Sequence, residues 1–412
     1  MFSASFLFAK SSMFRCSDQA SANNSLLIQL IIHTLKQINA YKLALGLAAI
    51  CLLVALVMIL NGSIHSAGPL LIIFFIALAI GFRGFAITKG FAYTMMIFAA
   101  VTTALYYPGY FTEINGFRFT SLITPLIQII MFGMGASMSV QDFVGVIKTP
   151  KAVMIGVFSQ FIIMPLIGFA LANASNFPPE IAAGIILIGC SPSGLASNVM
   201  NYLAKANLAL SITITSITTL LAPLMTPLLM KFLAGAFVEI NALTMMWDIC
   251  KMVILPIGGG LLFNKFLKGR AQWLDDAMPI VSMFGIAFII TIITAAGRDS
   301  LLEIGGILIG LVLVHNLLGY TLGYWAGRLF RMDERDCRTI AIEVGMQNGG
   351  LASGIAKEMG KIATVGLAPA VFGPLMNITG SILASYWHRK PPVDKQGEPV
   401  EEPVGELAIK QT

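Results

Sequence analysis

Apolar runs of roughly 20 residues alternate along the chain with short polar segments that carry Lys, Arg, Gly or Pro. A transmembrane helix needs roughly 20 predominantly apolar residues to cross the hydrocarbon core of a bilayer. The pattern therefore predicts an all-α polytopic membrane protein with twelve membrane segments. These segments span approximately residues 41–62, 67–84, 91–108, 119–138, 151–173, 179–203, 206–233, 243–264, 277–297, 303–328, 335–358 and 364–388.

Two of these segments are interrupted by similar runs of small and polar residues. One break covers residues 189–198 and the other covers 343–353. The tetrapeptide Gly-Leu-Ala-Ser occurs in both, starting at 194 and at 350, an offset of 350 − 194 = 156 residues. In lipid, non-helical backbone is tolerated only where it is buried in protein or lines a cavity. Paired breaks at corresponding places in two halves of a chain point to the binding site of a secondary transporter.

The similarity between the two halves extends beyond the breaks. The run 160–168 aligns with 315–323, and 131–133 aligns with 283–285. The last ten segments therefore form two sets of five. Because five is odd, the second set enters from the opposite face, which predicts inverted repeats whose broken helices cross at the midplane. The predicted organisation is an N-terminal tail (1–40), an accessory transmembrane hairpin (41–85), two five-helix repeats (88–236 and 240–388) and a disordered cytoplasmic tail (389–412).

Composition and loop charges agree with this class. Hydrophobic residues make up 57% of the chain and charged residues 11%, whereas soluble domains have about 25% charged residues. The net charge of +6 comes from basic residues in loops, so it is not a signal for nucleic acid. Most of these residues fall on one side of the membrane, and the positive-inside rule places both termini in the cytoplasm, with the chain in the cell's inner (plasma) membrane. The other side receives Arg118, Lys231, Arg298, Lys357 and Lys361.

Other function classes lack their usual sequence signals. The five scattered cysteines indicate neither a disulfide framework nor a metal site, and no Walker A pattern supports ATP-driven transport within this chain. An intramembrane enzyme is disfavoured because we find no Ser–His or Cys–His pair, metal-ligand cluster or paired intramembrane carboxylates. Residues 1–38, rich in serine and poor in acid, are compatible with a transit peptide or with an unstructured tail.

Glu343 is the residue that the apolar pattern does not explain. A carboxylate at membrane depth costs several kcal/mol unless it is paired, solvated or bound to a cation. The nearest basic residue, Arg338, lies at the cytoplasmic end of the segment. The break offers the unwound carbonyls of Val344 and Met346 and the amide of Gln347, hard oxygen donors that suit sodium better than zinc or copper. The alternative is a glutamate bonded to neighbouring backbone at an interface.

Further oxygen donors lie in and after the first break. Ser197 and Asn198 belong to the break, and Ser211 and Thr215 follow with i, i+4 spacing on one face of the next helix. Taken alone, such hydroxyls often bond to the carbonyl at i−4. Together with the two breaks and Glu343, they favour cation ligation.

Gln160 stands in an otherwise apolar run, five residues before Pro165. Its amide could bind a cation. It could equally satisfy carbonyl groups that the proline leaves without a partner.

The broken helices also predict an anion site. Each half-helix N-terminus carries about half a positive charge and unpaired N–H groups, so two such ends near one point favour an anionic substrate. The alternative for the glycines is that they only permit close helix crossing. The expected substrate-binding residues are Ser193, Gly194, Asn348 and Gly349, together with Asn377 in the last segment.

Three motifs together resemble the bile acid:sodium symporter (BASS) family: Met-Phe-Gly-Met-Gly at 131–135, the run at 190–198 and Glu-Val-Gly-Met-Gln-Asn at 343–348. The similarity covers roughly residues 91–388. It implies ten helices, with a panel domain (helices 1, 2, 6 and 7) rocking against a core domain (helices 3–5 and 8–10). It implies two sodium ions where helices 4 and 9 cross. The first site would use Ser197, Asn198, Ser211, Thr215 and Glu343, and the second Gln160, Glu343, Val344, Met346 and Gln347.

Two features depart from the family pattern. Pro-Ser-Gly-Leu at 192–195 stands where many relatives have Pro-Gly-Gly-Thr, on the substrate side of the break. The N-terminal hairpin makes twelve segments rather than ten.

The sequence therefore predicts a secondary transporter that imports an organic anion of bile-acid, pantothenate or keto-acid type with sodium. Its partners would be this anion, Na⁺ and the lipid bilayer, with no resident cofactor and no nucleic acid. Proton coupling through Glu343 is the first alternative, although a proton relay needs no cage of Ser, Thr and Asn side chains. A membrane sensor that binds its ligand without moving it is the second.

Overall fold

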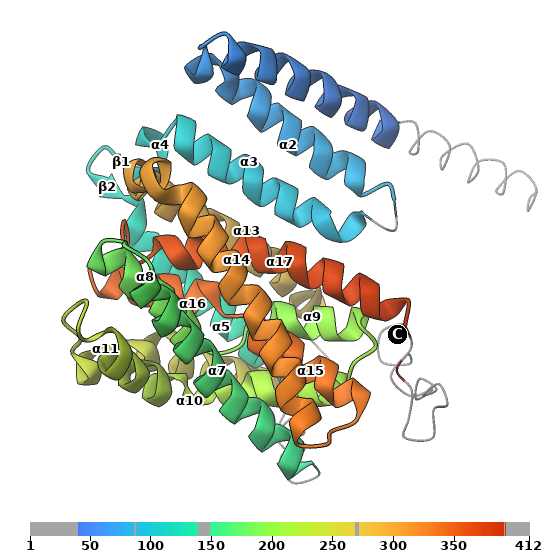
Figure 1. The fold of residues 1–412 in the computed structure, drawn as a ribbon, viewed down its shortest axis with the longest axis vertical. Helices are drawn as coiled ribbons and strands as arrows, with labels where there is room; N and C mark the ends of the chain where they lie inside the picture. The colour runs from blue at the N-terminus through green and yellow to red at the C-terminus, as the bar shows by residue number, and fades with distance from the viewer. Residues whose placement is uncertain (1–39, 86–87, 139–148, 268–271, 391, 393–412) are drawn as a thin grey trace, which may run out of the picture. The chain divides into compact units, whose positions relative to one another are not determined.

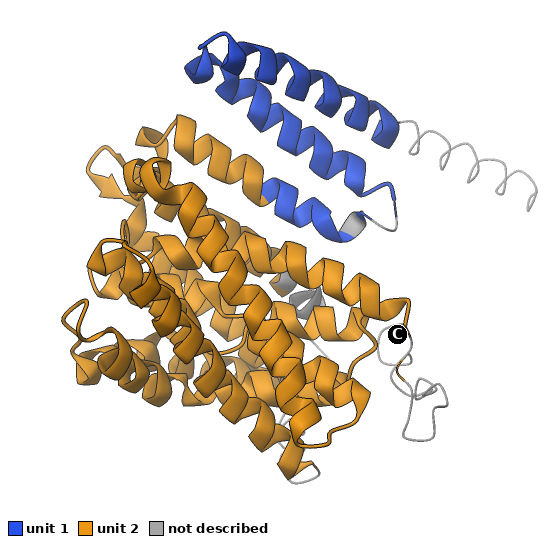
Figure 2. Cartoon of the chain, in the orientation of Figure 1, with its two compact units in different colours: residues 1–96 blue, residues 97–412 orange. Residues whose placement is uncertain are grey.

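The computed structural model describes residues 40–85, 88–138, 149–267, 272–390 and 392. The chain divides into two compact units, residues 1–96 and 97–412 (Figure 2). Most of the predicted terminal tails, 1–40 and 389–412, lies outside the described residues.

The first unit contains a helical hairpin. A turn at Gly62, whose φ of 76° suits glycine, joins its two long helices. Gly81 lets the helices approach closely, because a Cβ at this position would lie 2.5 Å from Leu45 Cδ2. Large side chains such as Leu60 remain exposed, as expected for helices that face lipid. The elements are the helix Ala40–Leu60, the 3-10 helix η1 (Ile64–Ala67), α2 (Gly68–Phe82), the 3-10 helix η2 (Lys89–Phe91) and the first residues of α3 (Ala92–Tyr106).

The second unit is a helical assembly with one small β-hairpin (Figure 1). The hairpin turns at Asn115 and Gly116, which both have positive φ, as this type of two-residue turn requires. The elements after α3 are α4 (Gly109–Thr112), β1 (Glu113–Ile114), β2 (Phe117–Arg118), the 3-10 helix η3 (Phe119–Leu122), α5 (Ile123–Ser137), α7 (Pro150–Ala174), α8 (Pro179–Cys190), α9 (Ala196–Leu203), α10 (Leu208–Ala234), α11 (Ala242–Ile249), the π-helix η5 (Cys250–Ile254), α12 (Leu255–Leu267), α13 (Gln272–Ala296), α14 (Arg298–Leu329), α15 (Glu334–Gly345), α16 (Gly349–Glu358) and α17 (Leu367–His388).

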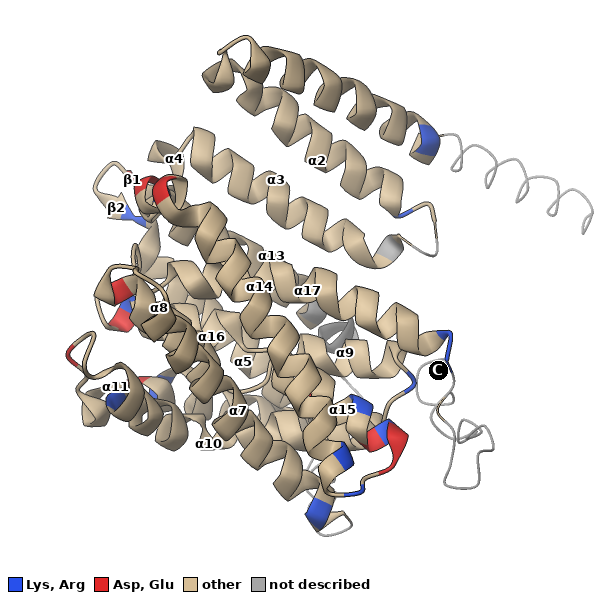
Figure 3. Cartoon of the chain, in the orientation of Figure 1, with Lys and Arg blue, Asp and Glu red and all other residues tan. Residues whose placement is uncertain are grey.

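The helices confirm the predicted all-α polytopic membrane fold. Each of the twelve predicted segments coincides with helix in the described chain, and 179–203 and 335–358 are each split into two helices, α8–α9 and α15–α16. Among the described residues, eight helices are long and apolar enough to cross a membrane, and α3, α8 and Ile280–Ala296 are shorter apolar helices. In the second unit, charged residues gather mainly at helix ends and in loops, with long uncharged stretches between them (Figure 3).

Two groups of helices pack within the second unit. One consists of α7–α10 with α14–α17, and the other of α5, η5, α12 and α13. Small residues allow the closest crossings in a membrane. On α14, a Cβ at Gly323 would lie 3.0 Å from Ala341 Cα, so α15 packs directly on the helix backbone there. In the other group, a Cβ at Gly135 would lie 2.2 Å from the Ile257 carbonyl oxygen.

Candidate functional site

The two breaks predicted from the sequence meet and bond to each other. Gly194 N–H donates to the Met346 carbonyl at 3.1 Å, and Asn348 N–H donates to the Pro192 carbonyl at 2.8 Å. These bonds satisfy backbone groups that neither helix can pair internally, which lipid would leave unsatisfied. The two segments run antiparallel. A side chain at Gly194 would collide with the partner break, because a Cβ would lie 2.8 Å from the Gln347 carbonyl oxygen.

The Glu343 carboxylate lies beside this junction and is completely buried. Hydroxyl and amide groups from the first break, α9 and α10 surround it. Hydrogen bonds to an ionised group are the strong kind, so this set holds the carboxylate in a defined position. Its Oε1 accepts from Ser197 Oγ (2.6 Å), Ser211 Oγ (2.6 Å) and Asn201 Nδ2 (3.2 Å), and its Oε2 accepts from Ser193 Oγ (2.7 Å) and Thr215 Oγ1 (2.7 Å).

Helical spacing explains how these groups converge. Ser197 and Asn201 are four residues apart on α9, and Ser211 and Thr215 are four residues apart on α10, so each helix presents two polar groups on one face. The hydroxyls of Ser211 and Thr215 donate to the carboxylate. This differs from Thr219, whose hydroxyl bonds to the carbonyl four residues earlier. The alternative of simple backbone bonding does not describe these two residues.

Asn198 lies behind the hydroxyls rather than against the carboxylate. Its Oδ1 lies 2.7 Å from Ser211 Oγ and 3.5 Å from Thr215 Oγ1, two hydroxyls that also lie against Glu343. Of the five residues expected at the first cation site, Ser197, Ser211 and Thr215 therefore contact Glu343 directly, and Asn198 contacts it through two of them.

Residues expected at the second site contact one another at the junction of the breaks. Gln160 Nε2 donates to the Ser191 carbonyl (2.9 Å) and to Gln347 Oε1 (2.7 Å), so it bridges the two breaks instead of capping a carbonyl of its own helix. Gln347 Nε2 in turn donates to the Val344 carbonyl at 2.7 Å. Within the described chain, Gln160 Oε1 is buried and has no hydrogen-bond partner.

One detail of the sequence interpretation is wrong. Glu343 and Val344 were expected in the unwound segment, but both lie in the last turn of α15, and the break begins only at Met346. The Val344 carbonyl has no partner within the helix, as is usual for the last four carbonyls, and it accepts from Gln347 Nε2 instead.

The expected substrate-binding residues lie along the second break and α17. Asn348 is the N-cap of α16, and its Oδ1 accepts from Leu351 N–H at 3.0 Å. Gly349 packs on α17, where a Cβ would lie 3.3 Å from the Pro369 carbonyl oxygen. Asn377 is half-buried on α17 and donates to the carbonyl four residues earlier. Ser193, by contrast, points its hydroxyl at Glu343.

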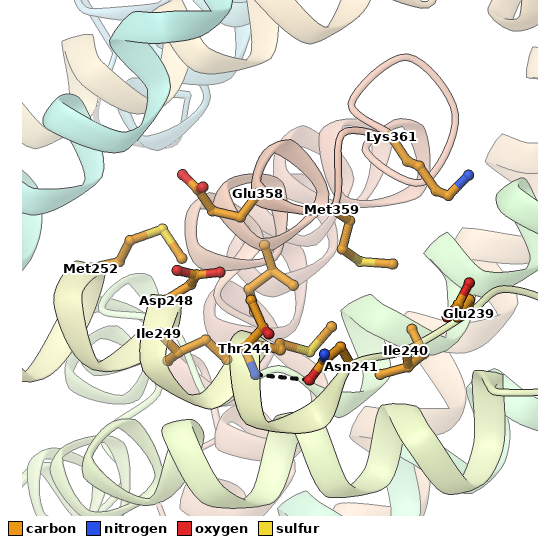
Figure 4. Close-up of a pocket in the computed structure, with 12 residues that line it drawn as sticks. Glu239, Ile240, Asn241, Thr244, Asp248, Ile249, Met252, Glu358, Met359 and Lys361 are labelled. Atoms are coloured by element: carbon orange, nitrogen blue, oxygen red, sulfur yellow. Dashed lines mark hydrogen bonds between the residues drawn. The ribbon is translucent and has the colours of Figure 1, made fainter.

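A cavity of about 170 Å³ lies between α11 and the end of α16 (Figure 4). Asp248 and Glu358 line it, and each forms an ion pair beside it, with Lys251 and Lys357 respectively, both at 2.8 Å. A larger, mainly apolar cavity of about 360 Å³ lies among α3, α13, α14 and α17. The residues that line these two cavities do not include Glu343.

Comparison with known proteins identifies the family. The model of the Sodium Bile acid symporter family matches residues 124–304. The sodium-dependent transporter YocS of Bacillus subtilis (strain 168) is 40% identical over 285 residues, which are 69% of this chain and 87% of that protein. The chain belongs to the sodium bile acid symporter family. This confirms the resemblance inferred from the three motifs.

Two plant relatives extend the comparison. The probable chloroplastic sodium/metabolite cotransporter BASS1 of Arabidopsis thaliana is 33% identical over 65% of this chain and 66% of its own length. The corresponding protein of Oryza sativa subsp. japonica is 33% identical over 66% of this chain and 68% of its own length. These relatives are named as transporters, and the family is one of sodium-dependent transporters rather than enzymes.

The sequence interpretation missed one residue that contacts the buried carboxylate. Asn201 is fully buried and donates to Glu343 Oε1. The available signal was its position one helical turn after Ser197, on the same face of an otherwise apolar segment.

Proposed function

We propose that this protein is a symporter that imports an organic anion with sodium by alternating access. The observation that carries the proposal is the fully buried Glu343 carboxylate, with hydroxyl groups from the first break, α9 and α10 converging on it. Within the described residues, none of the salt bridges involves Glu343. A buried carboxylate without a basic partner calls for a bound cation or a proton.

The chemistry of the donors favours sodium. A serine or threonine hydroxyl has two acceptor lone pairs besides its proton, so the oxygens that donate to Glu343 can also coordinate a cation. Hard oxygen donors suit hard cations, and the names of the relatives specify sodium.

We propose two sodium sites that share Glu343. The first would use the hydroxyl side of the carboxylate, and the second would use the side that faces the junction of the breaks. The unpaired Gln160 Oε1 supports the second site, because a buried acceptor without a partner is rare and calls for a ligand. The first set is Ser197, Asn198, Ser211, Thr215 and Glu343, and the second is Gln160, Glu343, Val344, Met346 and Gln347.

An organic anion would bind beside the cations at the half-helix ends. The start of α16 supplies a favourable helix dipole. We propose Ser193, Gly194, Asn348, Gly349 and Asn377 as its surroundings, and a bile acid, pantothenate or a keto acid as its type. One monovalent anion with two sodium ions carries one net positive charge inward, which gains about 2.3 kcal/mol per 100 mV of membrane potential.

Packing around the two half-helices supports alternating access. Both half-helices pack on α17. Helix α16 also packs on α5, α11, α13 and α8, whereas α9 also packs on α10 and α15 and leaves Val199 57% and Tyr202 56% exposed. The two helix groups are thus in contact beside α16. Rocking of one group against the other would close the α9 side and open the α16 side, where the cavity of Figure 4 lies.

The antiparallel pairing of the breaks supports an inverted repeat of residues 88–236 and 240–388. We place both termini in the cytoplasm and the protein in the plasma membrane, because the basic loop residues gather on the side of the α9–α10 connection. The α9 side would then face the cytoplasm.

Uptake by purified protein in liposomes tests the proposal. Radiolabelled taurocholate, pantothenate and pyruvate are offered under an inward sodium gradient, an inward proton gradient, or neither. We expect uptake of at least one anion that requires sodium, and its loss in Glu343→Gln, which keeps the shape and removes the charge. Uptake driven by a proton gradient without sodium would favour proton coupling instead. Sodium-dependent uptake of wild-type size in Glu343→Gln would refute the shared-carboxylate sites.

A further inference from the structure

Asn201 is the one amide that contacts the Glu343 carboxylate directly among the described residues. It lies on α9 and is fully buried. Its Nδ2 donates to Ser211 Oγ at 2.8 Å and to Glu343 Oε1 at 3.2 Å. Its carbonyl oxygen, Oδ1, is also buried and has no hydrogen-bond partner within the described chain.

A purely supporting role would explain the contacts of Nδ2 but not the unpaired Oδ1. The two donations by Nδ2 would hold Glu343 and Ser211 in place. The orphan Oδ1, however, loses its water without gaining a hydrogen bond, and buried side-chain oxygens without a partner are uncommon. Asn198, three residues earlier on α9, differs in this respect, because its Oδ1 lies within hydrogen-bond distance (2.7 Å) of the Ser211 hydroxyl.

We propose that Asn201 is a further ligand residue of the first sodium site, and that its amide carbonyl oxygen coordinates the ion. The inference rests on the proposed sodium coupling. The terminal torsion of asparagine is broad and roughly two-fold, so a half-turn that exchanges Oδ1 and Nδ2 has little torsional cost. It gives up the two donations by Nδ2, which the bound ion must replace. The carbonyl oxygen then takes the place of Nδ2, beside Ser211 Oγ and Glu343 Oε1.

The charge of the neighbouring groups couples this rotation of the Asn201 side chain to the binding of the ion. Without a cation, the N–H group faces the carboxylate and the carbonyl oxygen faces away, because two negatively polarised oxygens repel each other. A sodium ion between them reverses the preference, since an amide oxygen is a good ligand for a hard cation. Asn201 would thus raise sodium affinity and disfavour ions that do not fit among these oxygens.

Sodium-dependent thermal stabilisation of the purified full-length protein tests the inference. A ligand that binds only the folded protein raises its stability with concentration, so the half-stabilising sodium concentration reports affinity. Sodium chloride replaces choline chloride at constant ionic strength. We expect Asn201→Leu to raise that concentration about tenfold or more, because the substitution removes one ligand of the ion. We expect Asn201→Asp, which keeps two ligand oxygens and has no N–H donor, to stay within about threefold of wild type or to bind more tightly.

The control is Asn173→Leu, because Asn173 is an exposed amide that bonds only to the carbonyl four residues earlier on α7; it should respond like wild type. A wild-type response of Asn201→Leu would overturn the inference. A response of Asn201→Asp as weak as that of Asn201→Leu would also overturn it, because the N–H donor would then be the essential group. If Asn201→Leu aggregates, Asn201→Ser serves in its place with the same expectation, since its short hydroxyl cannot reach the ion.

Glu343→Gln in the same assay separates the two proposals: an unchanged sodium response there refutes sodium binding at Glu343 itself.

Discussion

Replacement of Thr215 by valine removes one hydroxyl from the Glu343 carboxylate and leaves the shape of the side chain unchanged. Thr215 is buried on α10, and its Oγ1 donates to Glu343 Oε2 at 2.7 Å. The loss of this oxygen as a sodium ligand should cost about as much as the loss of a hydrogen bond to a charged group, about 1.5–3 kcal/mol, and about 1.4 kcal/mol corresponds to a factor of ten in affinity. We therefore expect Thr215→Val to raise the half-saturating sodium concentration for uptake about ten- to one-hundred-fold.

Thr219→Val is the matched control on the same helix. Thr219 is equally buried, but its hydroxyl bonds only to the Thr215 carbonyl, one turn earlier. Loss of such a local bond should change the sodium dependence less than about threefold. Sodium titrations of uptake in liposomes, at equal amounts of inserted protein, give both values. Equal effects of the two substitutions would refute the assignment of Thr215 to the cation site and would leave only a general role of α10 in packing.

Two further predictions concern packing and topology. Gly323→Leu should lower the melting temperature strongly, because even a Cβ there would lie 3.0 Å from Ala341 Cα, and overpacking costs about 1–3 kcal/mol or more. The control is Gly310→Leu on the same helix, which should melt like wild type because a Cβ at Gly310 would have nothing within 4 Å. Equal melting curves of the two variants would contradict the close crossing of α14 and α15. In a chain without its five native cysteines, Lys361→Cys should react with an impermeant thiol reagent on intact cells, and Lys205→Cys should react only after permeabilisation; labelling of both from outside would refute the inverted repeat.

Interruptions in the apolar pattern already located the centre of the candidate site. Glycine, proline and serine at 189–198 disfavour a continuous helix, so the break between α8 and α9 could be predicted from local helix propensity. Glu343 stood out because a carboxylate is costly at membrane depth, whatever surrounds it.

Only the tertiary structure decided which groups meet at Glu343. Ser193 and Glu343 are separated by 150 residues, and their 2.7 Å contact depends on the pairing of the two breaks. The sequence suggested a substrate role for Ser193. It placed Asn201 one helical turn after Ser197, but it did not show that this face of α9 meets Glu343, because packing against α10 and α15 sets that contact. It also placed Val344 in the break, since single-residue preferences do not fix the last turn of a helix.

The sequence by itself determined the membrane class, the twelve segments, the positions of the breaks and the family motifs. These properties follow from the transfer of each side chain and backbone group into lipid, which depends on the local sequence alone. Tertiary structure decided the pairing of the breaks, the hydrogen bonds to the buried carboxylate and the unpaired oxygens of Gln160 and Asn201. Those features depend on contacts between helices far apart in the chain, and such a contact stabilises the protein only when both partners are in place.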